Sequence, residues 1–220
     1  MDLTAVNTIC TKMGLDDTQM LSLMVRTYSS VSKYLNGTVI APDMLQTYEH
    51  NESLDDRFNR VICEYIKQSR LLWNTIKTSY WEKPCYEMVC RFCAIIAGYK
   101  SFEIEDNDTR HKLIGYMRDA QYAEIEFVPK EYAIAIELFC AILKSDALSW
   151  YTVDVACWVM QWYLTSHNLG IFVYSGNHDA LVNAIGRYMD CIGTANEDVY
   201  CNELQRLLST CILTVDDVSK

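Results

Sequence analysis

Two neighbouring stretches of this chain are apolar on every side of a helix, and they constrain the fold more than any other feature. Within residues 132–143 the only charged residue is Glu137, and within residues 147–164 the only charged residue is Asp154. A helix without a polar face must be buried all round. The first stretch is short for a bilayer, which needs roughly 20 apolar residues, and the second carries Asp154 and Gln161. The two stretches therefore predict a hairpin of core helices.

Most of the remaining sequence shows the three- and four-residue apolar spacing of amphipathic helices. The clearest run extends to Ile76 from a capping box formed by Ser53 and Asp56, with its Lys and Arg residues on the opposite face. No alternating strand pattern is sustained. The sequence thus predicts an all-α protein. Further helices are expected from Asp16 to Leu35, from Pro84 to Gly98, from Asn107 or Asp108 through MRDAQY, from His178 to Met189, and after Asn196.

The 220 residues, half of them hydrophobic, suffice for one compact domain with a substantial core. The apolar spacing suggests an N-terminal helical extension at residues 1–52, joined loosely around Ala41-Pro42-Asp43. The main helical domain is then expected at residues 53–220. The role of this extension is left open among three alternatives: it folds over the back of the domain, it fills a groove on the domain, or it joins two copies of the chain into a homodimer.

Charge and cysteine usage restrict the partners and the compartment. A net charge of −10 disfavours a nucleic-acid surface, which needs clustered Lys and Arg. The N-terminal MDLTAVNTICTKMG lacks the pattern of a secretory signal, so the ten cysteines are expected to be reduced in a cytoplasmic setting. Near the C-terminus, CILTV is too short to span a bilayer. We expect no stable membrane span in this chain. Whether a C-terminal membrane anchor has been removed from it is left open.

No catalytic or cofactor motif stands out. Cys85, Cys90 and Cys93 match the first three positions of a plant-type iron–sulfur spacing, but Cys90 and Cys93 fall in an apolar helical run typical of buried cysteines. The four histidines are scattered, and none pairs with Cys or carboxylate at ligand spacing. There is no phosphate loop, nucleophile elbow or zinc-protease helix. We therefore expect no enzyme activity, no cofactor and no metal.

Four local sequence patterns lie along the expected helices and the turns between them. The stretch Phe172-Val-Tyr-Ser-Gly176-Asn-His178-Asp179 precedes ALVNAIG, so that a short polar turn with a glycine leads into an acidic-started helix. Before it, CWVMQWYLTSHN closes the second apolar stretch. Upstream, MVCRFCAIIAGYKSF combines small and large apolar residues in one stripe, and DDRFNRVICEYIKQSRLLW opens the main domain.

This order of helices resembles the Bcl-2 family of apoptosis regulators over roughly residues 53–192. The stretch from Phe172 to Asp179 would be the second homology motif, with Phe172 and His178 standing where the family has tryptophans. MVCRFCAIIAGYKSF would carry the third. The first motif, Asn-Trp-Gly-Arg, is missing, and Phe127-Val-Pro-Lys130 stands in its place. Such divergence is similar to that of viral members, so the resemblance implies a viral inhibitor of apoptosis in the host cytoplasm, which reaches mitochondria through its partners.

The resemblance also implies a hydrophobic groove that binds amphipathic helices of pro-apoptotic host proteins. Lys130, or alternatively Arg118, would meet the acidic residue of the bound helix. Two alternatives stay open: the same fold with a closed groove that binds another host signalling protein, and an unrelated all-α viral structural or assembly protein. The implied groove residues are Phe92, Ile95, Ile96 and Tyr99 on one wall, and Leu113, Tyr116, Met117 and Ile134 on the floor and the other wall.

Overall fold

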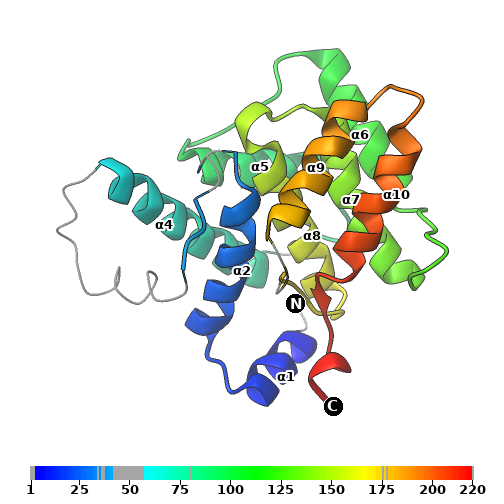
Figure 1. Ribbon diagram of the computed structural model, residues 1–220. Helices are drawn as coiled ribbons and strands as arrows, with labels where there is room; N and C mark the ends of the chain where they lie inside the picture. Colours follow the sequence, from blue (N-terminus) through cyan, green and yellow to red (C-terminus); the bar gives the residue numbers. More distant parts are fainter. Residues whose placement is uncertain are drawn as a thin grey trace.

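The computed structural model describes residues 3–33, 35, 38–41, 57–79, 81–174, 176 and 178–219, and this part of the chain is an all-α bundle (Figure 1). One pair of two-residue strands and two short 3-10 helices accompany the α-helices. The elements are α1 (Thr4–Met13), α2 (Asp17–Val31), α4 (Arg57–Thr78), α5 (Tyr86–Ala97), α6 (Asn107–Ala120), α7 (Lys130–Ser145), η1 (Ser149–Tyr151), α8 (Thr152–Ser166), β1 (Ile171–Phe172), α9 (His178–Cys191), α10 (Glu197–Ser209), β2 (Ile212–Leu213) and η2 (Asp217–Ser219).

The predicted core hairpin consists of α7 and α8, which pack closely against each other. Helix α8 is the centre of the bundle, because every residue from Thr152 to Thr165 is buried. Helix α7 is less enclosed: Lys130 is exposed, and Ile134 and Glu137 are half-buried. Helices α6 and α10 also pack against α7. No helix among the described residues has the length and apolarity needed to cross a membrane.

Asp154 and Gln161 of α8 are buried but hydrogen-bonded, which explains how a central helix accommodates them. The Asp154 carboxylate accepts hydrogen bonds from the Tyr65 hydroxyl at 2.8 Å and from the Ser32 hydroxyl at 3.0 Å. Gln161 Oε1 accepts from the Tyr28 hydroxyl at 3.0 Å and from the backbone N–H of Phe172 at 2.8 Å. These contacts connect α8 to α2, α4 and β1.

The described residues of the predicted N-terminal extension share the core of the bundle. Helix α2 starts at a capping box in which Asp16 and Gln19 bond each other's backbone N–H groups. It packs against α4, α8 and α9, and buries Met24 and Tyr28 completely. The predicted boundary at residues 52 and 53 and the capping box of Ser53 and Asp56 lie outside the described residues.

Two helix starts differ slightly from the sequence prediction. Helix α5 begins at Tyr86 with Cys85 as its N-cap residue, two residues after Pro84. The cap of α6 is Asp106, whose carboxylate accepts from the backbone N–H of Thr109 at 2.8 Å, rather than Asn107 or Asp108. Either neighbouring residue type can cap a helix, so composition alone does not identify the cap.

The one strand pairing joins distant parts of the chain. Strand β1 runs antiparallel to β2, with Ile171 opposite Leu213 and Phe172 opposite Ile212. Such a two-residue strand has no alternation for the sequence to reveal. The pairing holds the segment after α10 against the bundle, close to α1 (Figure 1).

Candidate protein-binding groove

Four of the implied groove residues lie in the core of the bundle. Phe92 and Ile96 on α5, and Leu113 and Met117 on α6, are all buried. The surrounding helices already cover these side chains. A partner helix would reach them only if one of the covering helices moved away.

The other implied groove residues lie on separate surfaces. Ile95 and Tyr99 border a pocket between α4 and α5. Tyr116 borders a different pocket, beside α10. Lys130 is exposed and Ile134 half-buried near the start of α7, and neither lines the pocket between α4 and α5. In this structure, therefore, the nine residues do not form one continuous groove.

The stretch that resembles the second homology motif forms the turn between α8 and α9. Phe172 is buried and its ring stacks on Tyr28, with centroids 5.6 Å apart. A Cβ atom on Gly176 would lie 2.7 Å from the end of the Tyr174 ring, so a larger residue there would displace that ring. His178 begins α9, as predicted, and its Nδ1 lies 2.9 Å from the Ser30 hydroxyl.

The two remaining features of that turn are electrostatic. Burial, and then the nearby positive charge of Arg26, lower the pKa of His178. The following residue, Asp179, is exposed in the first turn of α9. A carboxylate is favourable there because the N-terminus of a helix is its positive end.

The pocket between α4 and α5 has a volume of about 550 Å³, and we call it the α4–α5 groove. Its lining combines apolar side chains with a few polar ones at the rim. Two of the implied residues, Ile95 and Tyr99, belong to it. The residues that line it are Leu71, Thr75, Trp81, Glu87, Cys90, Arg91, Ala94, Ile95, Tyr99, Lys100, Ser101 and Phe102.

The aromatic side of the α4–α5 groove is fixed by the core. Trp81 is half-buried, and its ring makes edge-to-face contacts with Phe92 at 5.8 Å and with Trp162 of α8 at 6.4 Å. Edge-to-face pairs of this kind hold aromatic rings in a defined orientation. The buried residue Phe92 thus supports the groove from beneath.

Two large apolar side chains at the α4–α5 groove are exposed to solvent. Leu71 on α4 is 54% exposed, and Tyr99 after α5 is 61% exposed. Single exposed apolar residues are common, but two that border the same apolar pocket suggest a contact surface.

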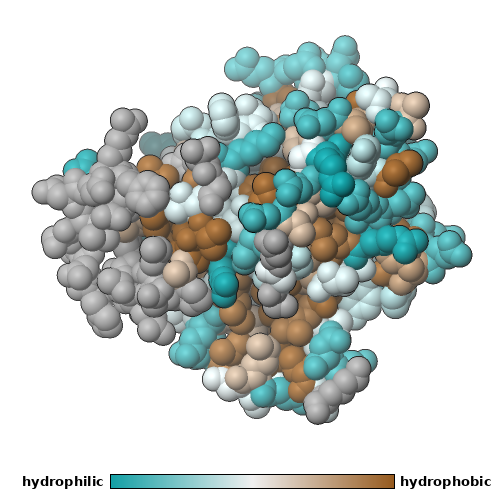
Figure 2. Space-filling view, in the orientation of Figure 1, coloured by the Kyte–Doolittle hydropathy of each residue, from teal (hydrophilic) through white to brown (hydrophobic). Residues whose placement is uncertain are grey.

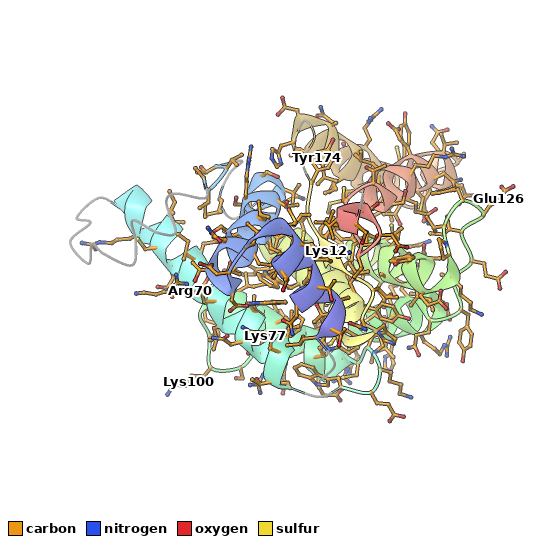
Figure 3. The ribbon with its side chains drawn as sticks, turned by 90° about the horizontal axis from the view of Figure 1, so that it is seen from below. Lys12, Arg70, Lys77, Lys100, Glu126 and Tyr174 are labelled. Carbon is orange, nitrogen blue, oxygen red and sulfur yellow. The ribbon has the colours of Figure 1, made fainter. Side chains whose placement is uncertain are left out.

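The chain segment that builds the α4–α5 groove is basic, although the protein as a whole is acidic. Residues 57–100 contain eight of the 19 Lys and Arg residues but only three of the 29 Asp and Glu residues. Figure 3 shows Arg70, Lys77 and Lys100 on the α4 side of the molecule, with Glu126 on the opposite side. This asymmetry favours an acidic partner for this face.

Two of these cations lie at the groove itself. Arg91 and Lys100 are exposed and line it, and neither side chain has a hydrogen bond or ion pair with any described residue. Lys77, by contrast, is paired with Asp17 at 2.8 Å. Arg118, an implied partner for an acidic residue, is paired with Asp119 at 3.2 Å.

The cysteines at the α4–α5 groove behave as apolar side chains. Burial raises the pKa of Cys85 and Cys90, and it raises the pKa of Cys93 to about 12. A protonated thiol is a weak nucleophile. Cys90, the one of these three that lines the α4–α5 groove, therefore suits a wall of the groove better than a reactive centre.

A second apolar pocket of about 730 Å³ lies between α1, α2 and the segment around β2. On the face drawn in Figure 2, hydrophobic residues gather in the lower part, over this region. Most of its large apolar residues are half-buried, and Asp216 and Asp217 lie at its rim. It lacks the pair of unpaired cations found at the α4–α5 groove.

Neither α4–α5 groove cation was singled out by the sequence analysis, which assigned that role to Lys130 or Arg118. The signal that would have found them is the excess of Lys and Arg over residues 57–100. Comparison of the chain with known protein families, with curated proteins and with solved structures found no match.

Proposed function

We propose that this protein is a binding module without catalytic activity, which holds an amphipathic, acidic helix of another protein in the α4–α5 groove. The observation that carries the proposal is an apolar pocket lined also by two cations, Arg91 and Lys100, that have no ion pair within the described residues. Following the resemblance to the Bcl-2 family, the partner is a pro-apoptotic host protein. This protein, as a viral inhibitor, would hold the pro-apoptotic protein in the host cytoplasm and thereby block cell death.

The shape of the α4–α5 groove matches what an amphipathic helix presents. Such a helix places apolar anchors at positions i, i+3 or i+4, and i+7 along one face. Leu71, Ile95 and Tyr99 offer apolar contacts for these anchors. Arg91 is available for an acidic side chain of the same helix, and its guanidinium can bind a carboxylate through two hydrogen bonds.

The small volume of the α4–α5 groove implies that a few contacts dominate binding. Tyr99 is the most exposed apolar residue of the groove, and aromatic residues often dominate binding energy. Replacing Tyr99 by alanine should cost about 2 kcal/mol, which weakens binding roughly thirtyfold.

Calorimetric titration with peptides from pro-apoptotic ligand helices tests the proposal. We expect sub-micromolar binding of at least one peptide, weakened by the Tyr99→Ala substitution and unchanged by Tyr122→Ala. Tyr122 is the matched control, because it is 77% exposed and does not line the α4–α5 groove. Absence of binding to every peptide would contradict the apoptotic role, and equal loss in both variants would contradict the site.

One observation favours a second candidate, a host signalling protein outside the apoptotic pathway. The burial of Phe92, Ile96, Leu113 and Met117 leaves the groove implied by the resemblance covered. A partner other than a pro-apoptotic helix would then use the α4–α5 groove. Pull-down from host cytosol with the unmodified protein and with the Tyr99→Ala variant tests this candidate. This candidate predicts a host protein that the unmodified protein retains and the Tyr99→Ala variant does not.

A further inference from the structure

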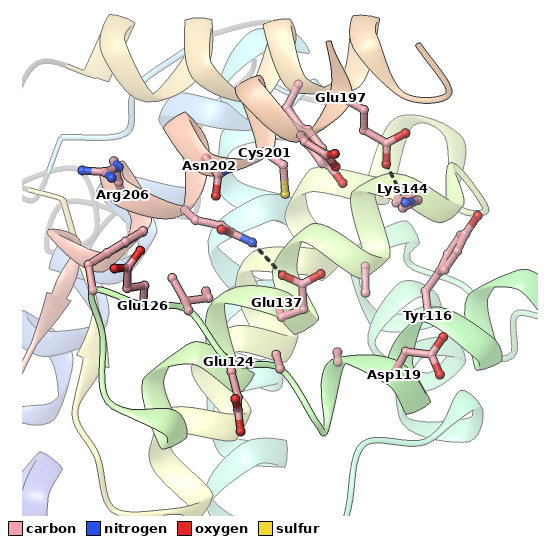
Figure 4. A pocket seen from close by; sticks show the side chains of 18 residues that line it. Tyr116, Asp119, Glu124, Glu126, Glu137, Lys144, Glu197, Cys201, Asn202 and Arg206 are labelled. Atoms are coloured by element: carbon pink, nitrogen blue, oxygen red, sulfur yellow. Dashed lines mark hydrogen bonds and ion pairs between the residues drawn. The ribbon is translucent and has the colours of Figure 1, made fainter. Parts of the chain in front are cut away.

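A pocket of about 850 Å³ lies between α7, α10 and the loop after α6, away from the α4–α5 groove (Figure 4). Its lining is polar, and it includes Glu137 on α7 and Cys201 on α10. Figure 4 shows these two side chains pointing toward each other from the two helices. A third potential ligand, Cys140, lies one helical turn after Glu137 and is buried.

These three residues form a compact group of metal-ligand types. The carboxylate oxygen of Glu137 and the sulfur atoms of Cys140 and Cys201 all lie within 4.8 Å of one another. Residues three apart in a helix share one face, so Glu137 and Cys140 both project toward α10. Among the described residues, no other group of three His, Cys, Asp or Glu residues meets this distance.

The surroundings of Glu137 match those of a metal ligand. Gln205 Nε2 donates a hydrogen bond to Glu137 Oε2 at 2.8 Å, which fixes the carboxylate and leaves its other oxygen without a described donor. Carboxylate ligands are commonly oriented in this way by a neighbouring hydrogen bond. The nearest cation, Lys144, is paired with Glu197 at 2.5 Å (Figure 4). Within the described residues, the Glu137 carboxylate thus lacks an ion-pair partner.

We propose that Glu137, Cys140 and Cys201 bind a divalent metal ion of the zinc type, which joins α7 to α10. Zinc accepts thiolate and carboxylate ligands at bond lengths of about 2.0 to 2.3 Å. Tetrahedral geometry with such bonds separates the ligand atoms by roughly 3.3 to 3.8 Å. The three groups need to move inward by only about 1 Å to reach it. The fourth position faces the pocket, where water can enter.

The ligand set also indicates which metal fits. Two sulfur atoms disfavour magnesium and calcium, which prefer oxygen ligands, and the carboxylate favours zinc over monovalent copper. Binding would convert both thiols to thiolates. Two protons per metal ion would be released to the solvent as the two metal–sulfur bonds form.

Titration of the reduced full-length protein with Zn²⁺, against a chromogenic chelator, tests the site, and Co²⁺ serves as a spectroscopic probe. We expect one metal ion per chain with sub-micromolar affinity, and an intense thiolate-to-Co²⁺ absorption band. The Cys201→Ser and Glu137→Gln substitutions should each weaken binding at least tenfold. Cys191→Ser is the matched control, since Cys191 is half-buried on α9 and outside the group, and it should leave binding unchanged.

The titration of the unmodified protein is decisive by itself, even if a variant folds poorly. No binding of Zn²⁺ or Co²⁺ by the reduced protein would overturn the proposal. Binding that survives both Cys201→Ser and Glu137→Gln would overturn it as well. Peptide binding at the α4–α5 groove is measured separately, so failure of one proposal does not imply failure of the other.

Discussion

At the scale of single residues, Asp154 is the most unusual group in the molecule. It is completely buried in α8, where burial raises its pKa to about 7, although the hydrogen bonds from Tyr65 and Ser32 act in the opposite direction. A carboxyl group in the unfolded chain titrates near 3.8. Folding therefore favours the protonated, neutral form of Asp154 over the intervening pH range.

This shift predicts a stability that falls as the pH rises. Below pH 3.8 both states hold the proton, and the Asp154 contribution is fully present. As the pH rises toward about 7, the unfolded chain loses the proton first, and the free energy of unfolding falls by about 1.4 kcal/mol per pH unit. Above pH 7 the loss is complete.

The Asp154→Asn variant should lack this pH dependence, because the amide has the shape of the carboxyl group and does not titrate. Urea unfolding of both proteins at pH 5, 6, 7 and 8 isolates the effect from that of other groups. We expect the unmodified protein to lose stability relative to the variant between pH 5 and 7. Parallel curves for the two proteins would show that Asp154 keeps its ordinary pKa.

At the scale of elements, the sequence predicts what depends on one helix and fails where two helices must be combined. The apolar stretch at residues 147–164 contains only one charge, so its central position could be predicted, and α8 confirms it from Thr152 onward, whereas Ser149 and Trp150 are exposed. By contrast, the sequence could not predict which face of α5 packs against the neighbouring helices. Four-residue spacing identifies an apolar stripe, but not whether the stripe meets another helix or a ligand.

The metal-ligand group shows the same limit. Glu137 and Cys140 are one turn apart on α7, but Cys201 follows some 60 residues later on α10. Only the packing of α10 against α7 brings the three together. The search for ligand spacing within one helix therefore led to the expectation of no metal, from which the zinc proposal departs.

Two glycines allow a matched test of element packing. A Cβ atom on Gly170 would lie 2.3 Å from the carbonyl oxygen of Leu213 in β2, whereas one on Gly186, in the exposed part of α9, would meet no atom within 4 Å. Gly170→Ala should therefore lower the free energy of unfolding by about 2 kcal/mol. Gly186→Ala should raise it by up to about 1 kcal/mol, because alanine favours the helix.

Urea unfolding followed by circular dichroism measures both glycine variants. Two results would contradict the packing described for β1 and β2: a Gly170→Ala protein as stable as the unmodified one, or equal effects of the two substitutions.

At the scale of the whole molecule, the described parts of the N-terminal segment belong to the same body as the rest. Tyr28 of α2 bonds Gln161 of α8, and Ser32 bonds Asp154. Deleting residues 1–52 would remove one hydrogen-bond partner from each of Asp154 and Gln161 and expose the core residues that α2 covers. A truncation therefore cannot test partner binding in this protein, and point substitutions at the surface are the appropriate tools.

The unequal distribution of charge is the other property of the whole molecule. The basic segment at residues 57–100 lies within a chain of net charge −10, so an acidic partner is attracted to one face and repelled elsewhere. Binding through Arg91 and Lys100 should weaken as ionic strength rises, since salt screens exposed charges. The apolar contacts of the partner with Leu71 and Tyr99 should not weaken as ionic strength rises.

The central claim is that a partner helix binds in the α4–α5 groove rather than in the groove implied by the resemblance. Ile95 belongs to both surfaces, whereas Ile134 belongs only to the implied groove and lies on α7 outside the α4–α5 groove, so these two half-buried isoleucines distinguish the two modes of binding. Nuclear magnetic resonance of isoleucine methyl groups, recorded while a binding peptide is added, measures both at once. The account predicts a large shift of the Ile95 methyl signal with little change at Ile134. A shift at Ile134 that leaves Ile95 unchanged would contradict it.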